Sequence, residues 1–237
     1  MMRNLFQLAL VCVVVGLPAC APPVEKKVPT KGITLAEFPS DIYQSAAARG
    51  EPVYAIDSAE SEVVILIYRG GLLAKMGHNH AVLSRDLHGF VLLAEDSDEA
   101  MADLYVPLKT LTVDESTKRA QSGFESSISE KDIAGTRRNM LEKVLDAESY
   151  PYAFIHIESD SSLYKHQVIK VDMTLNGFTR TMILPVEIER TKDKLGVSGK
   201  MVLRQTDFGM EPFSVFGGAL RVKDEIIVNF LLQASRL

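Results

Sequence analysis

The sequence predicts an all-β protein whose strands form an antiparallel barrel or a curled sandwich. About eight short runs are rich in β-branched and aromatic residues. Only one segment has helical periodicity, and the strand runs do not alternate with helices. A parallel βαβ sheet is therefore disfavoured. The chain has 237 residues, of which 46% are hydrophobic, so one domain has ample material for a core.

The predicted strands share a composition that suits a half-buried sheet, and several alternate between apolar and polar residues. Ile169, Val171 and Met173 fall on one face, while Lys170 and Asp172 fall on the other. This alternation indicates one face towards a core and one towards water. The predicted strands are residues 62–68, 90–93, 103–108, 153–159, 167–175, 181–189, 195–204 and 225–234.

One amphipathic helix is predicted over residues 132–148, in the string DIAGTRRNMLEKVLDAE. Its apolar residues follow helical spacing: Ile133, Met140, Leu141, Val144 and Leu145. A single helix in a β chain must bury this stripe, so we expect it to lie on the sheet or across one end of a barrel.

Two features of the C-terminal half predict local geometry. Asn176-Gly177 stands between two alternating strands and fits a tight turn with positive φ angles. Pro185 interrupts a strand and cannot donate a ladder hydrogen bond. We therefore expect an edge or a bulge at Pro185.

The N-terminus has the order of a secretory signal peptide, predicted as residues 1–19. Arg3 is followed by an apolar run from Leu5 to Leu17 and then by small residues. The string LPAC resembles a bacterial lipobox, in which the cysteine is acylated and the chain is cut just before it. This interpretation makes Cys20 a lipid anchor; a plain secretory signal with an incidental cysteine is the alternative.

The lipobox interpretation also predicts a location. Ala21, rather than an aspartate, follows the cysteine, so we expect anchoring to the outer membrane on the periplasmic side of a bacterial cell envelope. Cys12 would be removed with the signal, leaving Cys20 as the only cysteine, so no disulfide is expected.

Residues 20–51 are rich in proline and are predicted to be a tether, within which ITLAEF and DIYQSAAA can form short local structure. The barrel domain is predicted as residues 52–237. The formal net charge of -5 gives no global basic field, so nucleic acid is not an expected partner.

Three strings of the C-terminal half together resemble the YceI-like family: DAESYPYAFIHI, VDMTLNGFTRTMILPVEIE and GKMVLRQTDFGM. The similarity extends over roughly residues 52–235. It implies a lipocalin-like antiparallel barrel around an apolar cavity that holds a polyisoprenoid chain or another amphiphile. The chain departs from the family before Tyr150-Pro151, where many members have a charged stretch with a histidine, and its GHNH string occurs in only a subset.

The resemblance implies a lipid-binding protein, with a polyisoprenoid or an isoprenoid quinone as the ligand. Methionine and phenylalanine suit an adaptable apolar pocket. A solid core filled by the same side chains remains the alternative. The candidate ligand-binding residues are Met76, His78, His80, Ile155, Ile157, Val171, Met173, Leu175, Met201, Leu203 and Phe208.

The GHNH string places His78 and His80 on one face of any strand that contains both. Asp86 and His88 would extend this stripe only if the strand ran unbroken. A Zn²⁺ or Cu²⁺ site needs three or four ligands, and nothing in the spacing brings His156 or His166 to this pair. Metal binding, a polar contact to a ligand and a structural role all stay open for the pair.

Catalysis is not predicted, since the sequence has no GxSxG, HExxH, P-loop or Rossmann glycine pattern. The expected partners are a lipid or amphiphilic small molecule and the membrane that holds the anchor. The rival functions are a histidine-dependent metal-binding protein of the envelope and a structural lipoprotein with a solid core.

Overall fold

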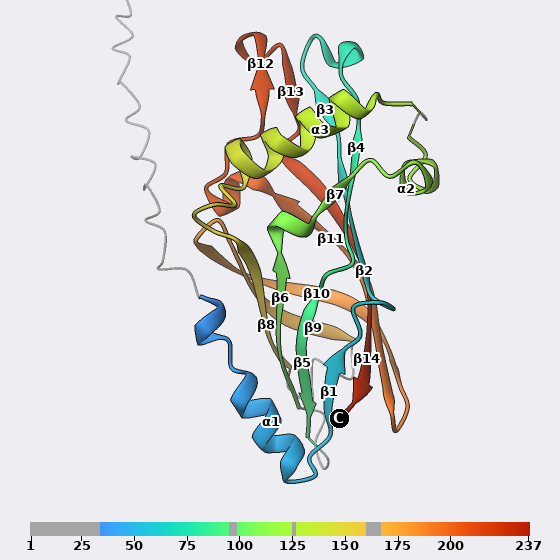
Figure 1. Cartoon of the computed structure of the whole chain (residues 1–237), viewed down its shortest axis with the longest axis vertical. Helices are drawn as coiled ribbons and strands as arrows, with labels where there is room; N and C mark the ends of the chain where they lie inside the picture. Colours follow the sequence, from blue (N-terminus) through green and yellow to red (C-terminus); the bar gives the residue numbers. More distant parts are fainter. Residues whose placement is uncertain (1–33, 95–98, 125–126, 160–166) are drawn as a thin grey trace, which may run out of the picture.

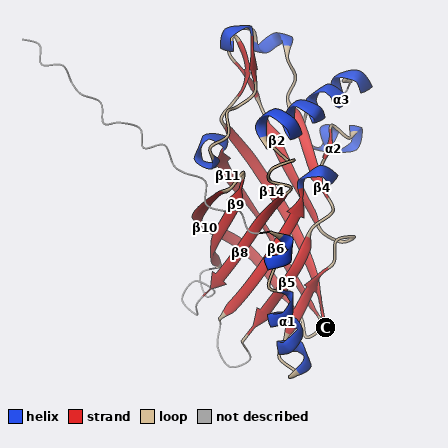
Figure 2. Cartoon of the chain, turned by 60° about the vertical axis from the view of Figure 1, so that its left-hand side comes forward, coloured by secondary structure: helices blue, strands red, loops and turns tan. Residues whose placement is uncertain are grey.

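The computed structural model describes residues 34–94, 99–124, 127–159 and 167–237, and these residues form an antiparallel barrel (Figures 1 and 2). Hydrogen-bonded neighbours follow the order β1-β5-β6-β8-β9-β10-β11-β14, and the ring closes because β14 also pairs with β1. The predicted all-β barrel is therefore confirmed.

The strands fall into three groups. The ring contains β1 (Val53–Ile56), β5 (His88–Leu93), β6 (Ala100–Pro107), β8 (Tyr152–Ser159), β9 (Val168–Leu175), β10 (Phe178–Arg190), β11 (Lys194–Arg204) and β14 (Glu225–Arg236). The wall continues at one end through β2 (Glu62–Ile67), β4 (His80–Ser84) and β7 (Thr112–Val113). A separate small sheet contains β3 (Arg69–Gly70), β12 (Ser214–Val215) and β13 (Leu220–Val222). All eight predicted strands are present, whereas β1, β4 and the two-residue and three-residue strands have no counterpart among the predicted runs.

The first three passes of the chain through the wall are each broken in the middle, giving the pairs β1/β2, β4/β5 and β6/β7. The hydroxyl of Ser58, in the first break, donates to the carbonyl of Leu87, in the second, over 2.5 Å. The third break is the short helix η3 (Leu108–Thr110). The halves β2, β4 and β7 turn away from the line of the halves β1, β5 and β6 (Figure 1). Strand β14 nevertheless pairs with both halves of the first pass, β1 and β2.

The predicted tight turn is present, with φ angles of 51° at Asn176 and 75° at Gly177. The next strand, β10, pairs with β9 only as far as Pro185, and its ladder with β11 begins at Val186. The amide of Val186 donates towards β9, to Gln167, so the ring nitrogen of Pro185 faces the other side, where residues 178–185 have no β11 partner. Pro185 thus lies on a local edge, as predicted.

The predicted helix is confirmed as α3 (Glu130–Asn139) followed by the π-helical turn η4 (Met140–Val144), which lie across one end of the barrel (Figure 1). Ser129 caps α3, because its side chain accepts from the amide of Asp132. The expectation of one helix is too low. The structure also has α1 (Ser40–Ala48), α2 (Ser116–Gln121), η1 (Leu35–Glu37), η2 (Ala74–Met76), η5 (Gln205–Phe208) and η6 (Phe216–Gly218).

Helix α1 lies in the predicted tether, but it packs on the outer face of the barrel. Tyr43 and Ala46 are fully buried, and the ring of Tyr43 stacks on Phe90 with centroids 5.4 Å apart. Residues 40–48 therefore do not behave as flexible coil, and the local structure that the sequence allowed there is helical. The predicted signal and Cys20 lie outside the described residues.

A polar chain fixes α1 to the wall. The hydroxyl of Tyr43 donates to Asp103 on β6 over 2.6 Å, and the other carboxylate oxygen lies 2.7 Å from Nδ1 of His156 on β8. Burial lowers the pKa of His156, but Asp103 and Glu158 outweigh burial and raise this pKa above its ordinary value. Burial and the carboxylate of Asp103 together raise the pKa of Tyr43.

The free energy of unfolding is expected to depend on pH through His156. Because its pKa is raised in the folded state, protonated His156 stabilises the fold fully below its unfolded pKa of about 6.5, and this contribution is lost as the pH rises through the folded pKa. The urea midpoint should therefore decrease as the pH rises from about 6 to about 8. His156→Asn should reduce the dependence of the midpoint on pH. His78→Asn, at an exposed position, should leave it unchanged; equal slopes for all three proteins would contradict the assignment.

Candidate functional site

The inner faces of the barrel strands enclose a cavity of about 250 Å³. The barrel is therefore hollow, and its side chains do not fill a solid core. The wall is almost entirely aliphatic. Its lining includes Ile56, Val63, Ile65, Ile67, Val82, Val91, Leu104, Val106, Ile155, Ile157, Val171, Met173, Leu184, Val197, Met201, Ile226, Val228, Phe230 and Leu232.

Ser84 and Gln205 are the only polar side chains among the described lining residues. Both are already hydrogen-bonded within the protein: Ser84 accepts from the amide of Asp86, and Gln205 donates to the carbonyl of Lys223. None of the described lining residues is charged. An apolar cavity of this kind excludes water and accepts apolar molecules, and its wall offers no group that could transfer a proton.

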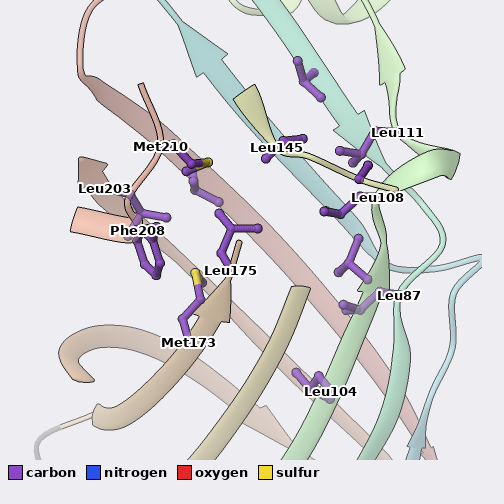
Figure 3. Packing of buried hydrophobic residues seen from close by; sticks show 14 of the residues in the cluster. Leu87, Leu104, Leu108, Leu111, Leu145, Met173, Leu175, Leu203, Phe208 and Met210 are labelled. Atoms are coloured by element: carbon purple, nitrogen blue, oxygen red, sulfur yellow. The ribbon is translucent and has the colours of Figure 1, made fainter. Parts of the chain in front are cut away.

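Seven predicted ligand-binding residues line the cavity, because each lies on the inner face of its strand: Ile155, Ile157, Val171, Met173, Leu175, Met201 and Leu203. Figure 3 shows Met173, Leu175 and Leu203 on the side opposite Leu87, Leu104 and Leu108. Their contact with a ligand stays a prediction. Sequence alternation was sufficient to identify them, since strand residues two apart share a face.

The other predicted residues do not line the cavity. Phe208 is buried on η5 and packs in the core beside Leu203 and Met210. Met76 lies on η2 and is 66% exposed, and His78 is exposed beside it. Met76 and His78 lie away from the cavity wall, because the chain leaves the barrel at Tyr68 and returns to it only at His80; their contact with a ligand stays a prediction.

The α3 end of the cavity is closed by residues that the sequence did not assign to the site. Met140 and Val144 of η4, with Leu145 after it, line the cavity together with Leu108 and Leu111 near η3. The apolar stripe of the predicted helix was the available signal. The sequence placed that stripe on the sheet or across a barrel end, and the structure shows the second arrangement.

His80 belongs to a buried polar cluster at the junction of β4 and β7. Its Nδ1 lies 2.6 Å from Asp114, whose other oxygen accepts from Arg119 over 2.6 Å and from the amide of Ala81 over 3.0 Å. Burial alone would raise the pKa of Asp114, but these hydrogen bonds and the charge of His80 lower it below the ordinary value. By register His80 shares the inner face with Ile67, which lines the cavity.

The histidines do not form the stripe that an unbroken strand would have produced. Strand β4 ends at Ser84, and His88 begins β5, where it bonds to Asp86 and stacks on Tyr105 with centroids 5.0 Å apart. His78 and His80 have ring centroids 6.5 Å apart. Within the described ranges, no group of three or more His, Cys, Asp or Glu residues could hold a metal ion. His166 lies outside those ranges, and metal binding stays a prediction that the pair alone does not complete.

Arg180 is a cation on the inner face of β10, beside the unpaired edge. It is the register partner of Met173, which lines the cavity, and its guanidinium lies 5.7 Å from the centroid of Phe178. One nitrogen, Nη1, donates to the carbonyl of Thr179. Its Nε and Nη2 are buried and have no hydrogen-bond partner among the described residues. Such donors favour an acceptor supplied by another molecule.

Replacing Asp114 with asparagine is expected to destabilise the barrel by about 3–5 kcal/mol, because it removes the carboxylate that neutralises buried Arg119. Glu115→Gln is the matched control: this neighbouring carboxylate pairs with Arg85 at the surface and should contribute about 0–1 kcal/mol. Urea unfolding of both variants gives the two free energies. A loss for Asp114→Asn no larger than that of the control would show that the cluster is not structural.

The profile of the YceI-like domain family matches residues 54–234. A polyisoprenoid binding domain from Saccharophagus degradans, implicated in plant cell wall breakdown, is similar in structure with a TM-score of 0.54 at 12% identity, covering 78% of this chain and 98% of that one. BcnA from Burkholderia cenocepacia is similar with a TM-score of 0.53 at 16% identity, covering 75% of this chain and 98% of BcnA. At these identities the likeness concerns the fold.

No curated protein matches the chain. In the part of the chain that the structure describes, no helix has the length and apolar character needed to cross a membrane.

Proposed function

The chain belongs to the YceI-like domain family, and from this premise we propose that its barrel binds and sequesters the hydrocarbon chain of a polyisoprenoid or an isoprenoid quinone. The observation that carries the proposal is the uncharged, almost wholly aliphatic wall of the cavity. Each methylene moved from water to such a wall contributes about 0.8 kcal/mol. A long prenyl chain therefore gains affinity from length alone.

The structural relative from Saccharophagus degradans supports this choice of ligand, because that protein is described as a polyisoprenoid binding domain. The aliphatic wall of this chain would accept other hydrocarbon chains too. Methionines at positions 140, 173, 201 and 210 add side chains that adapt to branched ligands.

The polar end of the ligand has a candidate partner in Arg180. A quinone carbonyl, a hydroxyl or a phosphate held near the β10 edge would accept from its unpartnered Nε and Nη2. The two buried nitrogens of Arg180 that lack an acceptor would be stabilised by such a ligand. The proposed ligand is thus an amphiphile with an acceptor-rich head and a prenyl tail.

The proposed setting is the cell envelope, with Cys20 acylated and the barrel held on the periplasmic side of the outer membrane. The lipobox-like LPAC string supports it. A barrel tethered beside a membrane would exchange prenyl lipids with that membrane without losing the protein to solution.

Acylation is tested by growing cells that express the full chain with labelled palmitate. The label should co-migrate with the protein and should be absent from Cys20→Ser, because that variant has no thiol at the lipobox position. Label retained by Cys20→Ser, or absent from both proteins, would remove the anchor from the proposal while leaving the cavity untouched.

Filling the cavity should abolish uptake of the ligand. Met201 lines the cavity, whereas its neighbour Val202 is on the outer face and is 58% exposed. The chain has no tryptophan, so Met201→Trp and Val202→Trp each introduce one reporter. Titration with a short-chain ubiquinone should not quench Met201→Trp, because its indole occupies the cavity. Val202→Trp should retain the saturable binding of the unmodified chain, as measured by native mass spectrometry.

Binding by the unmodified chain is measured by native mass spectrometry before and after organic extraction. A bound mass that is lost on extraction and restored by the ubiquinone is the expected result. Failure of every prenyl lipid to bind in a saturable manner, or equal binding by Met201→Trp and the unmodified chain, would contradict the proposal.

A further inference from the structure

We propose that the small sheet at the α3 end of the barrel docks on an anionic phospholipid surface by inserting its apolar tips. This flap is defined as residues 69–77 and 213–223. It is separate from the cavity, and the proposal does not depend on what the cavity holds.

The flap is a built structure that projects beyond the barrel. Its strands β3 and β13 pair through Arg221 and Gly70, and β13 pairs with β12 through Leu220 and Val215. The amide of Leu73 donates to the carbonyl of Ala219, so the two chain reversals lie side by side. Figures 1 and 2 show them at the extreme end of the molecule, past helix α3.

The tips of the flap carry large apolar side chains in water. Leu72 is 96% exposed, Phe216 is 69% exposed and Met76 is 66% exposed. Single exposed apolar residues are ordinary on proteins, but three gathered on adjacent loops at one extremity are typical of an interaction surface. Aromatic and leucine side chains are those that membrane-surface proteins bury at the headgroup and acyl boundary.

The backbone holds Phe216 in an unfavourable conformation at this exposed position. Its φ angle is 53°, and the next two residues, Gly217 and Gly218, have φ angles of 64° and 87°. A bulky residue with positive φ is strained. Burial of the ring within the protein does not compensate this strain, since the ring stands in water.

The charge of the flap is opposite to that of the whole protein. Its two segments contain Arg69, Lys75, Arg221 and Lys223 and no aspartate or glutamate, while the chain has a net charge of -5. Among the described residues, no carboxylate forms an ion pair with any of these four cations. The nearest acids along the chain are Glu211, which is exposed, and Asp224, which is paired with Arg204.

A flap with apolar tips and four cations that lack an acidic partner in the described part of the chain fits one occupant, the surface of a bilayer that contains anionic lipid. The tips would enter the acyl boundary, and the cations would remain at the level of the phosphates. The barrel wall also has exposed apolar residues, such as Ile183 on β10 and Val202 on β11, but these belong to the wall and not to a projecting tip.

The test uses the full chain with a single tryptophan in place of Phe216, or in place of Ile183 as the matched control, since Ile183 is 68% exposed on the wall. Vesicles contain brominated phosphatidylcholine with or without phosphatidylglycerol. We expect Phe216→Trp to shift to the blue and to be quenched by bromine when phosphatidylglycerol is present, and Ile183→Trp to remain as in water. Attachment of the N-terminus alone would not distinguish these two positions in this way.

Charge is tested in the Phe216→Trp background by Lys75→Gln and Arg221→Gln. Each should weaken the affinity for the anionic vesicles about fivefold, the factor that corresponds to one cation near such a surface. Unquenched Phe216→Trp, equal quenching at both tryptophan positions, or quenching that ignores lipid charge would each overturn the proposal. A blue shift without vesicles that grows with protein concentration would assign the tips to a second copy of the chain and would overturn it too.

Discussion

The barrel depends on β14, the last strand of the chain. Residues 225–235 of this strand pair with β11 along one edge, while the other edge pairs with β2 through residues 227–231 and with β1 through residues 234–236. The first pass of the chain is broken, so neither half alone could close the ring. A continuous strand opposite a broken one satisfies the backbone groups of both halves. The closed inner surface, and therefore the cavity, follows from this pairing.

Sequence patterns predicted the wall of the cavity better than its ends. Alternation assigned Ile155, Val171 and Met201 to the inner face correctly, because the two-residue period of a strand does not depend on tertiary context. Met76 and His78 lie outside the strands, where no such period fixes the direction of a side chain. The pairing of His80 with Asp114 joins residues 34 apart in the chain, and no local pattern contains that distance. The break between Ser84 and His88 was invisible for the same reason: nothing in its residues marks where β4 stops.

Ionisable groups are concentrated outside the cavity, and two clusters show their role. Tyr43, Asp103 and His156 fasten α1 to the outer face, while Asp114 and Arg119 fasten β7 and α2 to β4. A carboxylate buried in a hydrocarbon interior would be costly, so the fold uses carboxylates where partners from several elements converge. The interior is left to aliphatic side chains. The aliphatic side chains thus provide affinity for hydrocarbon, and the polar clusters outside the cavity hold the elements together.

Strand β10 pairs with β9 up to Pro185 and with β11 only from Val186 onwards. This change of partner makes one side of the barrel easier to deform. Residues 178–185 have no ladder bonds to β11, so the gap between these strands can widen without breaking any. Only the contacts of η5 would yield there, such as the bond from Asn176 to the carbonyl of Phe208. At the other junctions of the ring, from β1–β5 round to β11–β14 and β14–β1, widening would break a row of backbone hydrogen bonds. The ring can therefore widen between residues 178–185 of β10 and the facing part of β11. A thick or branched ligand would strain this one gap, and the strain would not be distributed around the ring.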